Sequence, residues 1–373
     1  MEKPIPIAVF GYNRSKHLEQ VLQMLKHCRG IEDGEVICFL DGAKGEKDRR
    51  EVEQVRSMVD QMQPGFPSLR VVARDVNRGL AASIVGGVSE IFADREQVIV
   101  LEDDIILHPL TLDYFRAMLE KFRDDPEVMS ISAFCGKDGQ DLEGYPHDVF
   151  GTYRMQCWGW ATWRDRWIGV DWDLKELGER LKDPDILQFY EKQVGVQSLR
   201  RLLGWREGRF DIWACRFIFA HVMSRKKCLC PVVSHAVNIG LDGSGTNCGS
   251  GGGRERADLI RWPEEDRQGG FHYFGGDFRV PDSAADLPDV SSWFLGKGTS
   301  HGAESPARPG IEMARIRIRN QLQEMKQNPD EIKKKLRKAK QRLGAMVKQG
   351  ARKVGLENGG APPAEALTLD DSA

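Results

Sequence analysis

The sequence places three consecutive carboxylates, Glu102, Asp103 and Asp104, directly after the apolar run 98–101. An apolar, β-branched run predicts a buried strand of a parallel sheet, and ligands of α/β proteins bind beyond the carboxyl ends of such strands. Three neighbouring carboxylates repel one another and are costly to bury unless a cation offsets them. Hard divalent cations such as Mg²⁺ and Mn²⁺ take carboxylate oxygens and commonly bridge them to substrate phosphates. The triplet therefore predicts a site for a metal ion and a diphosphate, with a solvated acidic turn as the alternative.

The three carboxylates of this triplet are expected to play different parts. Asp104 is the candidate ligand of Mn²⁺ or Mg²⁺. Asp103 would contact the metal indirectly or a ribose, and Glu102 would accept hydrogen bonds from sugar hydroxyls. Glu102 and Asp103 are therefore candidate donor-binding residues, and solvation at the strand end is the alternative for both.

Two further polar side chains follow strands predicted earlier in the chain. Arg14 comes after the strand at 5–10 and could contact a ribose or phosphates, whereas a surface arginine is the alternative. Asp41 comes after the strand at 35–40 and could accept a hydrogen bond from a uracil N–H. A turn aspartate before Gly42 is the alternative for Asp41.

Tryptophans crowd the segment 150–172, and a sugar ring can pack its C–H face against an aromatic ring. Trp160 is the candidate wall for the sugar of a donor, because Gly159 beside it permits a close backbone approach. Core packing is the alternative, and it is the preferred interpretation for Trp163, Trp167 and Trp172.

The segment 210–213, Phe-Asp-Ile-Trp, sets one aspartate among large apolar residues. Transfer of a sugar to a hydroxyl needs a group that takes the hydroxyl proton, and apolar surroundings would keep a carboxylate basic. Asp211 is therefore the candidate catalytic base. A helix N-cap is the alternative, since aspartate is favoured there and a helical pattern follows.

A stretch rich in glycine and small polar residues covers 238–247. Its glycines would let a lid close over a ligand, and Ser244 or Thr246 could cap a phosphate. An ordinary flexible loop is the alternative.

The elements that must position these residues alternate between strand and helix over the first 135 residues. Such alternation predicts an α/β fold whose sheet has helices on both faces. The turns after four strands would share one edge of that sheet, where a nucleotide could sit. The predicted strands are 5–10, 35–40, 69–73, 98–101 and 128–134, and the predicted helices are 15–27, 49–62, 80–92 and 110–122.

Composition limits the class of protein. The chain has 373 residues, a net charge of −2 and 29% charged residues, so a general affinity for nucleic acid is not expected. No apolar run approaches the ~18 residues needed to span a bilayer, and a secretory signal is not expected from the first residues. The eight cysteines lack metal-site spacing and are expected to be reduced and buried. The expected location is cytoplasmic, with peripheral contact to the inner membrane face as an addition.

Four regions are predicted along the chain: a catalytic domain at 1–253, a loop-rich extension at 254–309, a basic helical tail at 310–355 and a disordered end at 356–373. In the tail, apolar residues at helical spacing oppose lysines and arginines. A basic amphipathic helix can lie on an anionic membrane, so residues 311–353 are expected to contact a membrane surface. Packing on the catalytic domain or on a second copy of the chain, as in a homodimer, is the alternative.

Several blocks of the sequence resemble, in order, the glycosyltransferase-A (GT-A) fold, and within it a bacterial relative of the N-acetylglucosaminyltransferase I family. The strand at 5–10 with Arg14, the turn at 40–42 and the carboxylate triplet with its following helix resemble that family's donor site. Segments 158–160 and 210–213 resemble its acceptor-side and base segments. The blocks fall between residues 5 and 250.

The resemblance implies a Rossmann-like mixed sheet flanked by helices and an inverting, metal-dependent glycosyltransferase. Asp104 would hold Mn²⁺, Glu102 and Asp103 would contact the donor, and Asp211 would be the base. The chain has one aspartate where the family's base segment usually has a pair, and no counterpart of the membrane anchor or C-terminal domain of the Golgi members is expected.

The expected partners are a UDP-sugar donor, with GlcNAc as one candidate sugar, and a saccharide or glycolipid acceptor, which indicates polysaccharide biosynthesis. Two alternatives stay open at this point. A nucleotidyltransferase acting on a sugar phosphate also binds a nucleotide and a metal on an α/β sheet, although it usually has a glycine-rich loop after its first strand. The second alternative is a non-catalytic carbohydrate-binding module, and the joint presence of Asp104 and Asp211 argues against it.

Overall fold

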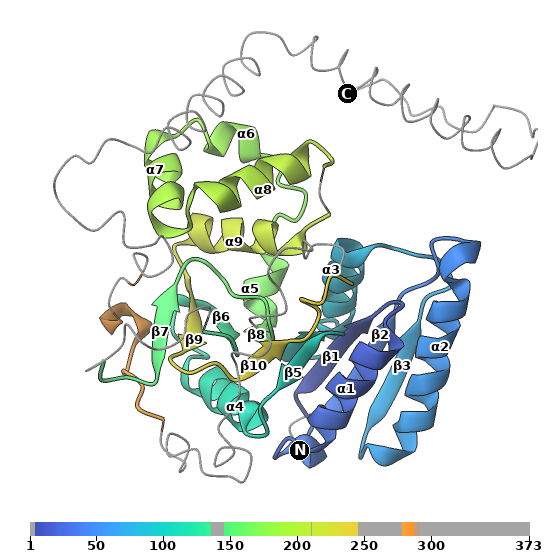
Figure 1. Ribbon diagram of the computed structural model, residues 1–373. Coiled ribbons are helices and arrows are strands. Elements are labelled where there is room, and N and C mark those ends of the chain that lie inside the picture. The colour runs from blue at the N-terminus through green and yellow to red at the C-terminus, as the bar shows by residue number, and fades with distance from the viewer. Residues whose placement is uncertain (1–3, 136–144, 210, 245–277, 288–289, 291–373) are drawn as a thin grey trace, which may run out of the picture. The chain divides into compact units, whose positions relative to one another are not determined.

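The computed structural model describes residues 4–135, 145–209, 211–244, 278–287 and 290, which are drawn in colour in Figure 1. The chain divides into two units, residues 1–304 and 305–373, and the fold below is that of the first. The predicted tail at 310–355, its membrane contact at 311–353 and the predicted disordered end at 356–373 lie outside the described residues. No helix in the described part of the chain is long and apolar enough to cross a membrane.

The centre of the fold is an eight-stranded sheet in the order β3-β2-β1-β4-β8-β6-β9-β7. The first four strands in this order are parallel to one another. β8 is antiparallel to both β4 and β6, β9 is parallel to β6, and β7 is antiparallel to β9. The strands are β1 (Pro6–Gly11), β2 (Glu35–Leu40), β3 (Leu69–Ala73), β4 (Gln97–Glu102), β6 (Val128–Ser132), β7 (Val149–Thr152), β8 (Trp160–Trp163) and β9 (Lys227–Pro231).

Helices cover both faces of this sheet, as the strand–helix alternation predicted (Figure 1). Side chains alternate between the faces along each strand, so Ile7 and Val9 of β1 join one core cluster, together with residues of α1, α2 and α4. Phe10 points to the other face, where Gly87 of α3 lies so close that an added Cβ would be 2.7 Å from the phenyl ring. These helices are α1 (Ser15–Lys26), α2 (Glu46–Met62), α3 (Leu80–Ile91) and α4 (Thr111–Lys121).

A helical segment between β8 and β9 completes the described fold (Figure 1). Its last helix, α9, contacts α3, α7 and α8. The segment consists of α5 (Arg164–Ile168), α6 (Leu177–Arg180), α7 (Pro184–Gln193), α8 (Val196–Arg206) and α9 (Trp213–Ser224). Elsewhere in the described chain, short 3₁₀ turns occur at Ile31–Asp33, Gln63–Gly65 and Ala284–Asp286.

Two short strands form a ribbon beside the sheet. β5 (Ile105–Leu107) begins directly after the carboxylate triplet and pairs antiparallel with β10 (Ala236–Asn238). This pairing returns the chain, more than 130 positions later, to the end of β4. The ribbon therefore brings the start of the predicted lid to the predicted site.

The predicted α/β class, with a mixed sheet flanked by helices, is confirmed. The antiparallel strand β8, which separates β4 from β6, was not predicted. Part of the predicted loop-rich extension packs against the core through Ala284 and Leu287, which are buried. The domain boundaries at 253 and 309 stay predictions.

Candidate functional site

The strand order reverses between β1 and β4. From β1 the chain continues to β2 and β3 on one side, and it then crosses to β4 on the other side of β1. At such a reversal the loops after the two strands separate and leave a crevice at the carboxyl edge, where open α/β sheets bind ligands. Arg14 follows β1, and Glu102 is the last residue of β4. Arg14 and the carboxylate triplet therefore meet at the reversal point.

Arg14 and the carboxylates are joined by hydrogen bonds. The Arg14 Nε donates to Asp103 Oδ2 at 3.2 Å, and Nη2 donates to Asp104 Oδ2 at 2.8 Å and to Asp103 Oδ1. Both aspartates are buried. The third nitrogen, Nη1, is also buried and has no hydrogen-bond partner among the described residues. Arg14 thus offsets two of the three carboxylates and keeps one donor unused.

Charge repulsion persists at this strand end. Burial, with the neighbouring Asp104 and Asp103 carboxylates, raises the pKa of Glu102 to about 8, although a hydrogen bond from the Trp213 side chain opposes the rise. Burial raises the pKa of Asp103 to about 6, against the opposing effect of Arg14. Burial alone would lower the pKa of Arg14, yet Asp103 and Asp104 raise it above its usual value. A further cation beside these groups would oppose the rise and favour the ionised form of Glu102.

The segment after β10 closes over Asp104. The Ile239 N–H donates to the backbone oxygen of Asp104 at 2.9 Å, and the Gly240 N–H donates to Asn238 Oδ1 at 2.7 Å. A Cβ at Gly240 would lie 2.2 Å from Asp104 Oδ2 and 2.8 Å from Arg14 Nη1. The first residues of the predicted lid are therefore anchored to the site, and Thr246 lies outside the described residues.

Replacement of Gly240 by alanine is expected to abolish metal-dependent nucleotide binding while leaving the fold intact. The added methyl group would overlap the Asp104 carboxylate and force it away from Arg14. Gly169→Ala is the matched control, because a Cβ at Gly169 meets nothing within 4 Å. Isothermal titration with UDP and Mn²⁺ measures the effect, and equal affinities for the two variants would contradict this account of Asp104.

Asp41, the predicted uracil contact, holds the turn after β3. Its two carboxylate oxygens accept hydrogen bonds from the backbone N–H groups of Gly42, Arg78 and Gly79 and from Asn77 Nδ2, at 2.9 to 3.1 Å. Asp41 is buried and lies at the carboxyl end of β2, where it was predicted. Its described bonds are those of a turn aspartate, and contact with a uracil stays a prediction.

Trp160, the predicted wall for the sugar, is a core residue. Its ring is 0% exposed and stacks on Trp167 and Trp213, with ring centroids 5.7 and 5.0 Å apart. No ring face is left for a ligand in this conformation, because strand β8 directs the side chain beneath α9. Trp163 and Trp167 are also buried, which confirms core packing for them.

The aromatic core nevertheless reaches the site through Trp213. This residue begins α9, stacks on Trp160 and is near enough to Glu102 to lower the pKa of its carboxyl. It therefore links the triplet to the segment that holds the predicted base.

Asp211, the predicted base, lies two residues before Trp213. Its Oδ2 accepts a hydrogen bond of 3.4 Å from the Ala81 N–H in the first turn of α3. The side chain is exposed, so the predicted apolar surroundings are not observed. The predicted N-cap role is also wrong for the helix that follows, since Ile212 is the N-cap residue of α9. Asp211 instead lies against the start of a different helix.

The chemistry of the triplet fits a divalent cation that is held jointly by protein and substrate. Within the described residues, no cluster of three or more His, Cys, Asp or Glu side chains could hold a metal ion by itself. Ions at diphosphate sites are usually held by one or two carboxylates plus substrate oxygens. Asp104 and Asp103 could supply such oxygens.

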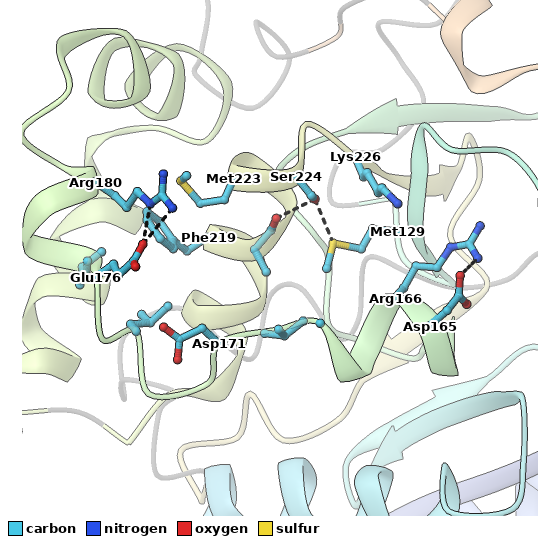
Figure 2. Close-up of a pocket in the computed structure, with 15 residues that line it drawn as sticks. Met129, Asp165, Arg166, Asp171, Glu176, Arg180, Phe219, Met223, Ser224 and Lys226 are labelled. Atoms are coloured by element: carbon cyan, nitrogen blue, oxygen red, sulfur yellow. Dashed lines mark hydrogen bonds and ion pairs between the residues drawn. The ribbon is translucent and has the colours of Figure 1, made fainter.

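A separate pocket of about 480 Å³ lies near the opposite edge of the sheet (Figure 2). Met129 lines it from the amino end of β6. β6 runs parallel to β4, because both strands are antiparallel to β8. The pocket therefore lies toward the amino ends of these strands, whereas the carboxylate triplet lies at the carboxyl end of β4. Ion pairs of Arg166 with Asp165 and of Arg180 with Glu176 border the pocket. The pocket therefore does not include the sequence-predicted site residues.

Comparison with known proteins finds no matching family model and no matching curated sequence. Among solved structures, the mannosyltransferase PcManGT from Pyrobaculum calidifontis, in complex with GDP-Man and Mn²⁺, is 20% identical with a TM-score of 0.34. That match covers 44% of this chain and 46% of the mannosyltransferase, so the matched part spans less than half of that protein. S. aureus TarS 1–349 is 14% identical, with a TM-score of 0.39, and the match covers 64% of this chain and 61% of TarS 1–349. An active-site mutant of LgtC is 9% identical, with a TM-score of 0.33, and the match covers 70% of this chain and 99% of the LgtC chain.

Proposed function

We propose that the chain is a GT-A-type glycosyltransferase that transfers a sugar from a UDP-sugar to a saccharide acceptor with inversion. The observation that carries the proposal is the meeting of Arg14 with Asp103 and Asp104 where the strand order reverses. This arrangement combines an unused guanidinium donor for a phosphate with carboxylates for a metal ion. Both parts can bind the oxygens of a nucleotide diphosphate.

In the proposed reaction, Asp211 takes the proton of the acceptor hydroxyl. The hydroxyl oxygen then bonds to the anomeric carbon of the donor sugar as the bond from that carbon to the UDP oxygen breaks. Arg14 binds the diphosphate, which gains negative charge as it leaves. A divalent cation at Asp104 would supply further stabilisation of that charge.

The proposal is tested with a panel of UDP-sugars and saccharide acceptors. UDP release is measured in the presence of Mn²⁺ and again after chelation, with GDP-mannose and ATP as other nucleotides. We expect metal-dependent UDP release from one UDP-sugar, with UDP-GlcNAc the first candidate. Release that is equal with and without metal, or confined to other nucleotides, would overturn the proposal.

The product of an α-linked UDP-sugar is expected to be β-linked. A single carboxylate base and a direct attack by the acceptor invert the anomeric centre, whereas a covalent intermediate would require two displacements. Proton NMR of the product distinguishes the two anomers. An α-linked product would refute the inverting mechanism even if transfer itself were observed.

A further inference from the structure

A buried arginine on α9 lacks an anionic partner. Arg216 is 9% exposed, yet within the described part of the chain its guanidinium forms no ion pair with a carboxylate. Its Nη1 donates a hydrogen bond to the Trp172 carbonyl at 2.9 Å. Its Nε is buried and has no hydrogen-bond partner among the described residues. The edge formed by Nε and Nη2, which can hold a carboxylate with two N–H groups, is therefore unused by the described residues.

Two tryptophan rings flank this guanidinium. The Arg216 Cζ lies 4.8 Å from the centroid of the Trp205 ring and 5.9 Å from that of the Trp172 ring. Trp205 belongs to α8 and Trp172 to the segment between α5 and α6, so three elements converge on Arg216. Trp172 also packs on Trp167, with centroids 4.3 Å apart, as expected of a core residue. Both Trp172 and Trp205 are only half-buried, so part of each side chain stays accessible beside the cation.

The position of Arg216 on α9 connects it with the proposed base. Asp211 precedes this helix by two residues, and it lies against the start of α3, where a Cβ at Gly79 would be 3.0 Å from its Oδ2. Arg216 follows Trp213, the first residue of α9, by about 4.5 Å along the axis, which is three residues at the usual helical rise. The guanidinium therefore belongs to the end of α9 that starts beside Asp211.

The charge of Arg216 is only partly offset. Burial lowers the pKa of Arg216, although the neighbouring Cys215, Asp211 and Asp173 oppose this effect. A buried cation without a close anion is costly, and contact with two aromatic rings offsets part of the cost. An anion supplied by a ligand would offset the rest. Because two carboxylates already act on this place, a ligand with one negative charge suits it better than a doubly charged phosphate.

We propose that Arg216, Trp172 and Trp205 bind an acidic sugar of the acceptor, one that has a carboxylate on its ring. The planar guanidinium fork matches the two oxygens of a carboxylate, and the C–H face of a sugar can pack against a tryptophan ring. A neutral sugar would leave the cation without an anion. The inference deepens the proposed function, on which it rests, by making the acceptor a saccharide that contains a uronic acid.

The test compares sugars that share one ring and differ in one exocyclic group. Glucuronate has a carboxylate, glucose has a neutral hydroxymethyl group, and glucose 6-phosphate has a phosphate. The full-length protein is first saturated with UDP and Mg²⁺, so that the donor site is filled, and each sugar is then titrated and followed by NMR. We expect glucuronate to bind about tenfold more tightly than glucose, the usual effect of charged hydrogen bonds, and more tightly than glucose 6-phosphate.

Arg216→Gln is expected to abolish the preference for glucuronate, and Arg216→Lys to reduce it, because lysine keeps the charge without the planar fork. Arg225→Gln is the matched control and should keep the preference. Arg225 follows the last residue of α9 and also lies over an aromatic ring, with its Cζ 3.4 Å from the Phe189 centroid, but it is exposed. Thermal unfolding checks that each variant is folded, and the preference of the wild-type protein is measured without any variant.

Equal affinities of the wild-type protein for glucuronate and glucose would overturn the proposal, and so would a preference that survives in Arg216→Gln. Tighter binding of glucose 6-phosphate would assign the place to a phosphate and would also overturn it. If the wild-type protein failed to bind UDP, the proposed function would fail by itself. The glucuronate titration of the free protein would still decide whether Arg216 binds an acidic sugar.

Discussion

Replacement of Asp104 by alanine is expected to abolish UDP binding in the presence of Mn²⁺. The substitution removes a buried carboxylate at the strand end and leaves Arg14 bonded to Asp103, so the fold should persist. Without Asp104 the protein loses its candidate metal ligand, and the charge of the diphosphate is no longer screened. Isothermal titration with UDP, with and without Mn²⁺, measures this loss.

Asp165→Ala is the control for this variant, because Asp165 lies at the separate pocket and pairs with Arg166. It should bind UDP and Mn²⁺ as the parent protein does. Retention of metal-dependent binding by Asp104→Ala would show that the metal site lies elsewhere.

Replacement of Asp211 by asparagine is expected to lower the rate of transfer by about 10²–10⁴, the usual contribution of a positioned base. An amide cannot take the acceptor proton, but its oxygen can still accept the hydrogen bond from the Ala81 N–H. Donor binding should therefore be unchanged. Steady-state rates measured beside UDP titrations separate the two effects.

Asp173→Asn is the matched control for this prediction. Asp173 and Asp211 are both exposed, and both interact electrostatically with Arg216. A merely electrostatic role of Asp211 would make the two variants similar. Near-normal turnover of Asp211→Asn would move the base to another residue.

The parts of this site that follow strand ends could be predicted from the sequence. Arg14 comes shortly after one apolar run and the carboxylate triplet directly after another, and the carboxyl ends of parallel strands share one edge of a sheet. The hydrogen bonds of Arg14 with Asp103 and Asp104 confirm that these segments meet. Local patterns were sufficient here because each residue is placed by its own strand.

The parts that depend on long-range packing could not be predicted. Gly240 approaches Asp104 only because β10 pairs with β5, and three-residue strands carry no periodic signal. The cluster of tryptophans in the sequence does not show whether the Trp160 ring is buried or exposed, because a tryptophan can pack in a core as well as against a sugar ring. Asp211 has apolar neighbours in sequence, yet its carboxylate is exposed.

The central claim is that the reversal between β1 and β4 binds a nucleotide diphosphate with a metal ion. The most direct test is isothermal titration of the wild-type protein with UDP and Mn²⁺, compared with UDP alone and with ATP and Mg²⁺. The account predicts binding of UDP that requires Mn²⁺ and exceeds the binding of ATP and Mg²⁺. Tighter binding of ATP and Mg²⁺, as expected of a nucleotidyltransferase, or no binding of UDP with Mn²⁺, as expected of a carbohydrate-binding module, would contradict it.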